Sequence, residues 1–74
     1  MISHELRQLL RTSPFRPFRL HLADGRHIDI PHPEFVFVLH KEPMAIFEHE
    51  DGRTEWINLP IVTSVEALPG SHAA

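Results

Sequence analysis

The sequence predicts a mainly β domain, in which one short N-terminal α-helix precedes five to six antiparallel strands that close into a small barrel. Two Asp-Gly-Arg triplets, at 24–26 and 51–53, each stand between alternating apolar runs. Asp-Gly is a strong hairpin signal because Gly adopts positive φ without a Cβ clash. The run after each triplet ends at a proline, Pro31 or Pro60. A barrel would remove the exposed edges that so small an open sheet leaves.

The chain length of 74 residues fits one domain, predicted to span residues 1–68 with a flexible tail at 69–74. A domain of this size buries only about 60% of the surface of its unfolded chain. Because the chain has no cysteine, disulfides cannot add stability, and we expect a homo-oligomer instead. No apolar run suits a signal peptide or a membrane span, which predicts a cytoplasmic protein without membrane contact.

The first element is predicted as a helix over about residues 3–12, with Ser3 as its N-cap. Its apolar residues fall on one helical stripe. They are Ile2, Leu6, Leu9 and Leu10. Pro14 and Pro17 end the helix, and a helix this short is stable only when its stripe docks, which we expect to happen on the sheet.

The first hairpin has a register that its side chains define. A three-residue loop at 23–25, with Gly25 in the left-handed region, places all apolar groups on one face. The predicted apolar pairs are Phe18 with Ile30 and Leu20 with Ile28, and the polar pairs are His21 with His27 and Arg19 with Asp29.

The later strands are predicted at 35–39, 44–50, 54–59 and 63–68. The segment 35–39 is apolar on both faces, which predicts a strand covered on both sides, in the middle of a sheet or at a bend. A two-residue turn at Asp51-Gly52 would set Phe47 opposite Trp56 and Ile46 opposite Ile57.

The order of these elements resembles the Sm-like branch of the SH3-like barrels, which includes bacterial Hfq-type RNA chaperones. The likeness rests on the Leu-rich helix, a strand ending in Asp-Gly (18–25), an aromatic third strand and a final Thr-Ser-Val-Glu-Ala-Leu strand. It implies a ring-forming RNA-binding protein. An acidic segment, 47–51, replaces the Tyr-Lys-His segment of the bacterial members, so no RNA-contacting residue is transferred.

Three shorter segments resemble small uncharacterised bacterial proteins, and this likeness implies no function. They are Pro14–Leu20, Leu22–Arg26 and His32–Phe35.

Charge is divided along the chain: residues 1–26 carry +3 and the remainder carries −6. Such a division suits head-to-tail self-association. A basic N-terminal segment also suggests, as an alternative, a nucleic-acid-binding regulator. Its candidate residues are Arg7, Arg11, Arg16 and Arg19. The acidic remainder disfavours phosphate, and for the helix flank with His4, Arg7 and Arg11 a solvated face is favoured over a phosphate-binding edge.

Seven histidines in a cysteine-free chain raise a third hypothesis, a His-based metal-responsive protein. The best ligand pair is His21 with His27, and Asp29 lies on the same face. Zinc needs three or four converging ligands, and no spacing in the chain fixes a further one. We therefore predict no cofactor.

Catalysis is not predicted, because no serine lies in a nucleophile elbow and no Gly-rich phosphate loop occurs. The sequence favours a non-enzymatic binding or assembly module, homo-oligomeric, with a protein partner as a further option. Aromatic residues are the candidates for its interaction surface. They are Phe35, Phe37, Phe47 and Trp56. Trp56 has two placements open to it, of which the core is favoured over an exposed contact.

Overall fold

The computed structural model describes residues 1–69, and within them it contains one α-helix and six strands. These elements are α1 (Ser3–Arg11), β1 (Phe18–Leu22), β2 (His27–Ile30), β3 (Val36–Val38), β4 (Met44–Glu48), β5 (Thr54–Asn58) and β6 (Val62–Ala67). Short 3₁₀ helices at Pro33–Phe35 and Leu59–Ile61 precede β3 and β6. Of the predicted tail, residues 70–74 lie outside the described range. No helix among residues 1–69 is long and apolar enough to cross a membrane.

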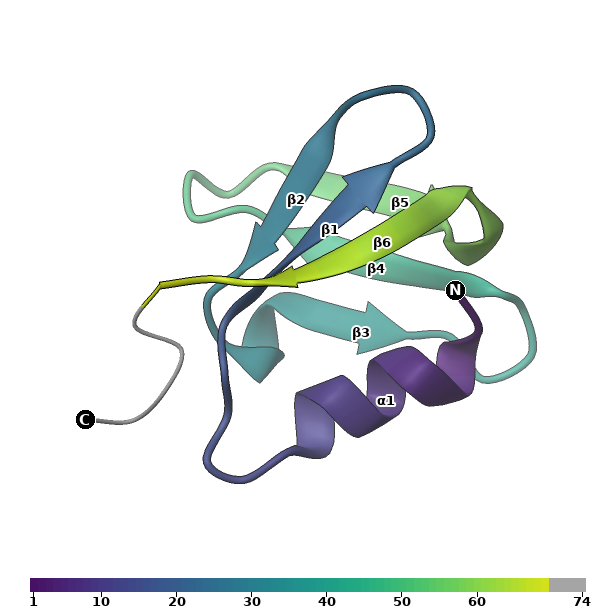
Figure 1. Ribbon diagram of the computed structural model, residues 1–74. Coiled ribbons are helices and arrows are strands. Elements are labelled where there is room, and N and C mark those ends of the chain that lie inside the picture. The colour runs from purple at the N-terminus through teal and green to yellow at the C-terminus, as the bar shows by residue number, and fades with distance from the viewer. Residues whose placement is uncertain (70–74) are drawn as a thin grey trace.

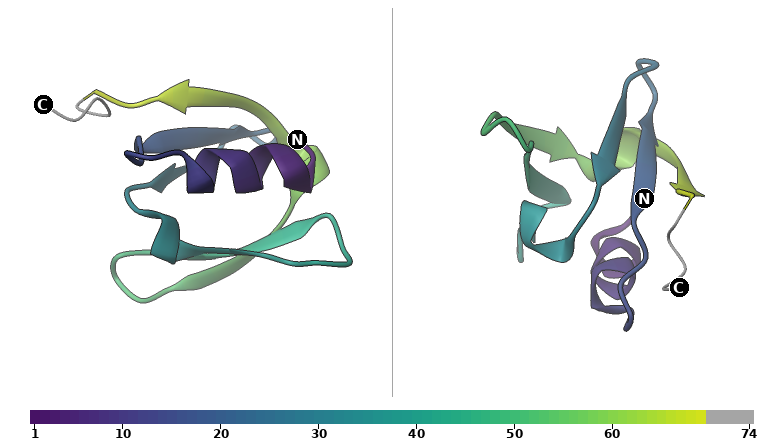
Figure 2. Two further views of the ribbon diagram at one scale, coloured as in Figure 1. Left: turned by 90° about the horizontal axis from the view of Figure 1, so that it is seen from below. Right: turned by 90° about the vertical axis from the view of Figure 1, so that its left-hand side faces the viewer.

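The strands form two three-stranded antiparallel sheets, in the orders β2-β1-β6 and β3-β4-β5 (Figure 1). The prediction of a mainly β domain with one helix is therefore confirmed. Among the described residues no strand pairing joins the two sheets into a closed barrel. Seen from below, α1 lies across the side of the molecule between the two sheets (Figure 2).

The core lies between the inner faces of the two sheets, with Leu6 of α1 fully buried against it. Leu9 and Leu10 are half-buried against the same core, whereas Ile2 is exposed. Ile2, and not Ser3, is the N-cap residue: its backbone is extended and its N–H donates to the Glu5 carboxylate at 3.0 Å. The helical stripe docks as predicted, although its first member does not contribute.

The first hairpin has the predicted register at all four residue pairs. Gly25 has φ +91°, its N–H donates to the Leu22 carbonyl at 3.0 Å, and Leu22 N–H donates to the Arg26 carbonyl at 2.9 Å. This geometry is a three-residue loop whose last residue is left-handed.

The second hairpin has the same loop, and the predicted register is wrong by one residue. Gly52 has φ +94°, and its N–H donates to the His49 carbonyl at 2.9 Å. The three-residue loop at 50–52 sets Ile46 opposite Trp56 and Phe47 opposite Glu55. In this register Glu48 lies opposite Thr54, whereas a two-residue turn would have set it opposite Glu55.

Strand β3 also differs from the expectation. It is an edge strand, because β3 pairs only with β4 in the order β3-β4-β5. Val38 is buried against the core, whereas Phe37, on the opposite face, is 55% exposed. The described part of the chain therefore covers one face of this apolar strand and leaves the other open.

Candidate functional site

An exposed apolar row crosses the sheet β3-β4-β5 on the side away from the core. Phe37 of β3 is opposite Ile46 of β4, and Ile46 is opposite Trp56 of β5. Trp56 is 63% exposed, Phe37 is 55% exposed, and Ile46 between them is half-buried. Residues directly opposite each other in an antiparallel pair have side chains within contact range. The three side chains therefore form one continuous apolar row.

Neighbours on the same side extend this row. Leu39 and Met44 flank it where β3 meets β4, and the Leu39 N–H donates to the Met44 carbonyl at 3.0 Å. Both are half-buried. We call the whole set the outer apolar face. Its members are Phe35, Phe37, Leu39, Met44, Ile46 and Trp56.

At one end of the outer apolar face the surface is hollowed. The hollow is lined by Glu34, Phe35, Val36, Phe37, Ile46, Glu48 and Thr54. Its apolar lining comes from the 3₁₀ helix at Pro33–Phe35, from β3 and from β4, and two exposed glutamates also line it. The hollow thus combines apolar contact with negative charge.

Two of the aromatic residues lie differently from the prediction. Phe47 is only 1% exposed and belongs to the core, so its assignment to an interaction surface is wrong. Trp56, for which the core was favoured, is exposed. In the observed register Phe47 and Trp56 face opposite sides of the sheet, whereas the predicted register set them opposite each other on one side. Phe35 and Phe37 do line the surface hollow.

Two of the four candidate arginines for nucleic acid contact other groups of the chain. Arg7 Nη2 donates to the Leu39 carbonyl at 2.8 Å, and Arg19 pairs with Asp29 at 2.6 Å. Arg11, in the last turn of α1, and Arg16, between α1 and β1, are exposed. Within residues 1–69 neither of these two makes an ion pair.

The histidine pair lies on the outer side of the other sheet, as its register requires. The rings of His21 and His27 are 6.3 Å apart, and His21 Nε2 lies 2.8 Å from a Glu66 carboxylate oxygen. Asp29 is held by Arg19, whose hydrogen bond lowers the pKa of this carboxyl. In the part of the chain that the structure describes, no three His, Asp or Glu side chains gather as metal ligands.

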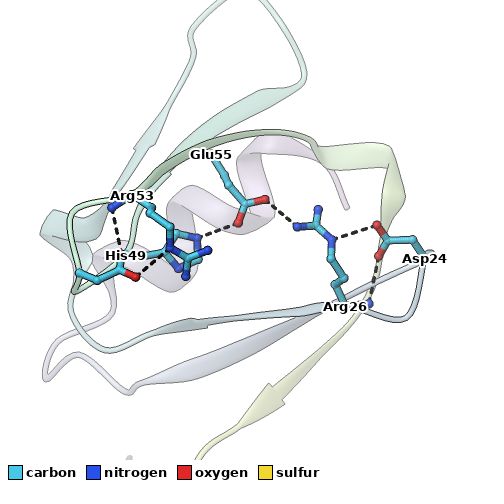
Figure 3. A network of polar contacts seen from close by, with 6 residues as sticks. Asp24, Arg26, His49, Arg53 and Glu55 are labelled. Atoms are coloured by element: carbon cyan, nitrogen blue, oxygen red, sulfur yellow. Dashed lines mark hydrogen bonds and ion pairs between the residues drawn. The ribbon is translucent and has the colours of Figure 1, made fainter.

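A polar network joins the two hairpins (Figure 3). Arg26 Nη1 lies 2.7 Å from Glu55 Oε2, and Arg26 Nε lies 3.0 Å from Asp24 Oδ2. His49 Nε2 lies 2.7 Å from the other Glu55 oxygen. The hydrogen bonds from Arg26 and then His49 lower the pKa of the Glu55 carboxyl. This network connects the two sheets, and both carboxylate oxygens of Glu55 have partners in it.

Sequence reasoning did not identify Ile46, Glu34 or Glu48 as members of a site. Treating both Asp-Gly turns as the same loop would have placed Ile46 opposite Trp56. Glu34 and Glu48 lie beside the hollow only because the 3₁₀ helix at Pro33–Phe35 adjoins the end of β4. No spacing in the sequence signals that contact.

Comparisons with protein-family models, with curated proteins and with solved structures found no match.

Proposed function

We propose that the protein is a non-enzymatic binding module that assembles with further copies of itself through the outer apolar face. The observation that carries this proposal is the exposed row Phe37, Ile46 and Trp56 across three paired strands. Monomeric proteins rarely expose contiguous apolar patches larger than a few hundred Å², and larger patches mark interaction sites. Aromatic residues are moreover enriched in the centres of protein interfaces.

The exposed aromatic area of this face is smaller than the area that a stable interface between two copies buries. The exposed parts of Phe37 and Trp56 offer on the order of 200 Å² together, given the size of aromatic side chains. A stable interface buries roughly 800 Å² on each partner. The contact must therefore extend beyond the row to neighbouring segments and to charged groups at its margin.

A second copy of the chain is favoured over nucleic acid as the partner. Arg7 and Arg19, two of the four candidate arginines, are engaged with a carbonyl and a carboxylate of the chain itself. The net charge of −3 opposes the phosphate contacts that dominate nucleic-acid affinity. The division of charge between the N-terminal segment and the remainder supports contact between copies.

The Sm-like likeness is part of this proposal. The pairing of β1 with the last strand, β6, supports an open, SH3-like barrel as the class of the two packed sheets. The likeness favours a closed homo-oligomer over an open chain of subunits.

Light scattering during size-exclusion chromatography tests the proposal. Wild-type protein should show a mass above that of one chain, and Trp56→Ser should shift it toward the monomer. Val65→Ser is a matched control, because Val65 is apolar and 41% exposed but lies on β6, in the other sheet. A wild-type monomer at millimolar concentration, or equal effects of both substitutions, would contradict the proposal.

A further inference from the structure

Several exposed charged side chains make no ion pair within residues 1–69. Arg19, Arg26 and Arg53 each pair with an acidic side chain. Arg11 and Arg16 make no ion pair within residues 1–69, and neither does Glu48; Glu34 has only a 3.9 Å contact with His32. Arg11 and Arg16 thus lie at the end of α1 and just after it, and these two carboxylates lie at the hollow. Lys41, between β3 and β4, is a further exposed cation without an ion pair in this range.

The hollow has the chemistry to hold an arginine side chain. Phe35, Phe37 and Ile46 provide apolar contact for the methylene groups. A guanidinium is weakly hydrated, stacks on aromatic rings and pairs with carboxylates, and Glu34 and Glu48 stand beside the rings. A lysine would gain less here, because its ammonium is more strongly hydrated.

The segment that carries Arg16 is pre-ordered for such a contact. Pro14 and Pro17 fix their own φ angles on either side of it. Phe15 is held in place, with its ring 5.9 Å from that of Phe18 and 6.2 Å from that of His32. Arg16 itself is exposed between these anchored residues. Little backbone entropy remains to be lost when the segment binds.

We infer that Arg16 of one copy occupies the hollow of a second copy, with its guanidinium between Glu34 and Glu48 and its stem on Phe37. This inference rests on the proposed self-association and names the charged contact that supplements the outer apolar face. Each such contact therefore pairs opposite charges across the interface between two copies.

Charge reversal with mixing tests the pairing. Arg16→Glu and Glu48→Arg should each weaken self-association about tenfold or more, as expected for a close interfacial charge pair. An equimolar mixture of the two variants should associate again, because each contact between unlike variants then pairs a carboxylate of one copy with a guanidinium of the other. Analytical ultracentrifugation measures the masses, and circular dichroism checks that each variant is folded.

Glu42→Arg is the matched control, since Glu42 is exposed without an ion pair in the described chain and lies before β4, whereas Glu48 ends that strand. It should associate as wild type does. The neutral variants Arg16→Gln and Glu48→Gln should each weaken self-association less than the corresponding charge reversal.

The outcomes separate the inference from the proposed function. If wild type associates and both charge reversals leave it unchanged, the Arg16 contact is wrong and the outer apolar face alone suffices. The contact is also wrong if both variants dissociate but their mixture does not associate again. A monomeric wild type that gains no mass at low salt would overturn both proposals.

Discussion

The guanidinium of Arg26 lies 2.7 Å from the carboxylate of Glu55, 29 residues further along the chain. Arg26 follows the first Asp-Gly turn, and Glu55 lies in β5 just after the second. The two residues belong to different hairpins, so the ion pair joins the hairpins to each other (Figure 3). His49 contacts the other oxygen of the same carboxylate at 2.7 Å.

Replacing Glu55 should weaken the link and reduce the sensitivity of the fold to acid. Hydrogen bonds from Arg26 and His49 lower the pKa of Glu55 in the folded state. A lowered pKa stabilises the fold above the unfolded-state pKa of about 4.3, and this contribution is lost as the pH falls through the folded-state value. Glu55→Gln should therefore lower the urea midpoint near neutral pH and show a smaller decline in acid.

Glu42→Gln provides the control for that experiment, because Glu42 is exposed and forms no ion pair within residues 1–69. Its urea midpoint should follow wild type at each pH. Identical acid profiles for Glu55→Gln and wild type would show that the link contributes nothing to stability.

The two turn glycines should be intolerant of a Cβ for conformational reasons alone. Gly25 and Gly52 have φ of +91° and +94°, and a Cβ built at either position meets no heavy atom within 4 Å. Gly25→Ala and Gly52→Ala should each cost about 1 to 2 kcal/mol from the left-handed backbone. Asn should cost less, because it tolerates this region. Equal stability of the Ala variants and wild type in urea unfolding would refute the turn assignment.

Truncation of Phe47 should reduce the stability of the fold far more than truncation of Trp56. Phe47 is 1% exposed, so Phe47→Ala should cost about 3 to 5 kcal/mol and leave little folded protein. Trp56→Ser, on the exposed face, should change the stability of the monomer by only about 0.5 kcal/mol. Chemical denaturation followed by circular dichroism compares them. A folded, stable Phe47→Ala variant would contradict the register of the second hairpin.

Trp56 also reports directly on the outer apolar face. It is the only tryptophan and the chain has no tyrosine, so its fluorescence can be excited selectively. Acrylamide should quench it strongly in dilute protein and less strongly as the concentration rises and copies cover the ring. Quenching that does not change with concentration would argue against burial of Trp56 on association.

Arg7 should matter for stability, whereas Arg11 should not. Arg7 Nη2 donates to the Leu39 carbonyl at 2.8 Å and so ties α1 to the end of β3. Arg7→Met should cost about 1.5 to 3 kcal/mol, the usual value for a hydrogen bond that involves a charged group. Arg11 lies one helical turn further, and Arg11→Met should have the same urea midpoint as wild type. Equal midpoints for both variants would show that the Leu39 contact is not stabilising.

The register of the first hairpin was predictable because its two faces differ in polarity. Phe18 and Leu20 alternate with Arg19 and His21, and the partner strand alternates in the same way. A slip of one residue would have turned charged groups toward the core, so the sequence admits a single register. The mainly β class and the docked Leu6 follow from equally clear periodicity.

The two faces of the second hairpin do not differ in polarity in this way. Ala45, Ile46 and Phe47 are apolar in succession, as are Trp56 and Ile57, so a slip of one residue still sets apolar groups opposite each other. The sequence alone therefore leaves the register open. Packing decides it, because the other sheet lies on only one side of this hairpin and the side chains that face it are buried. Phe47 became core and Trp56 became surface for that reason, and so the outer apolar face exists only in the tertiary structure.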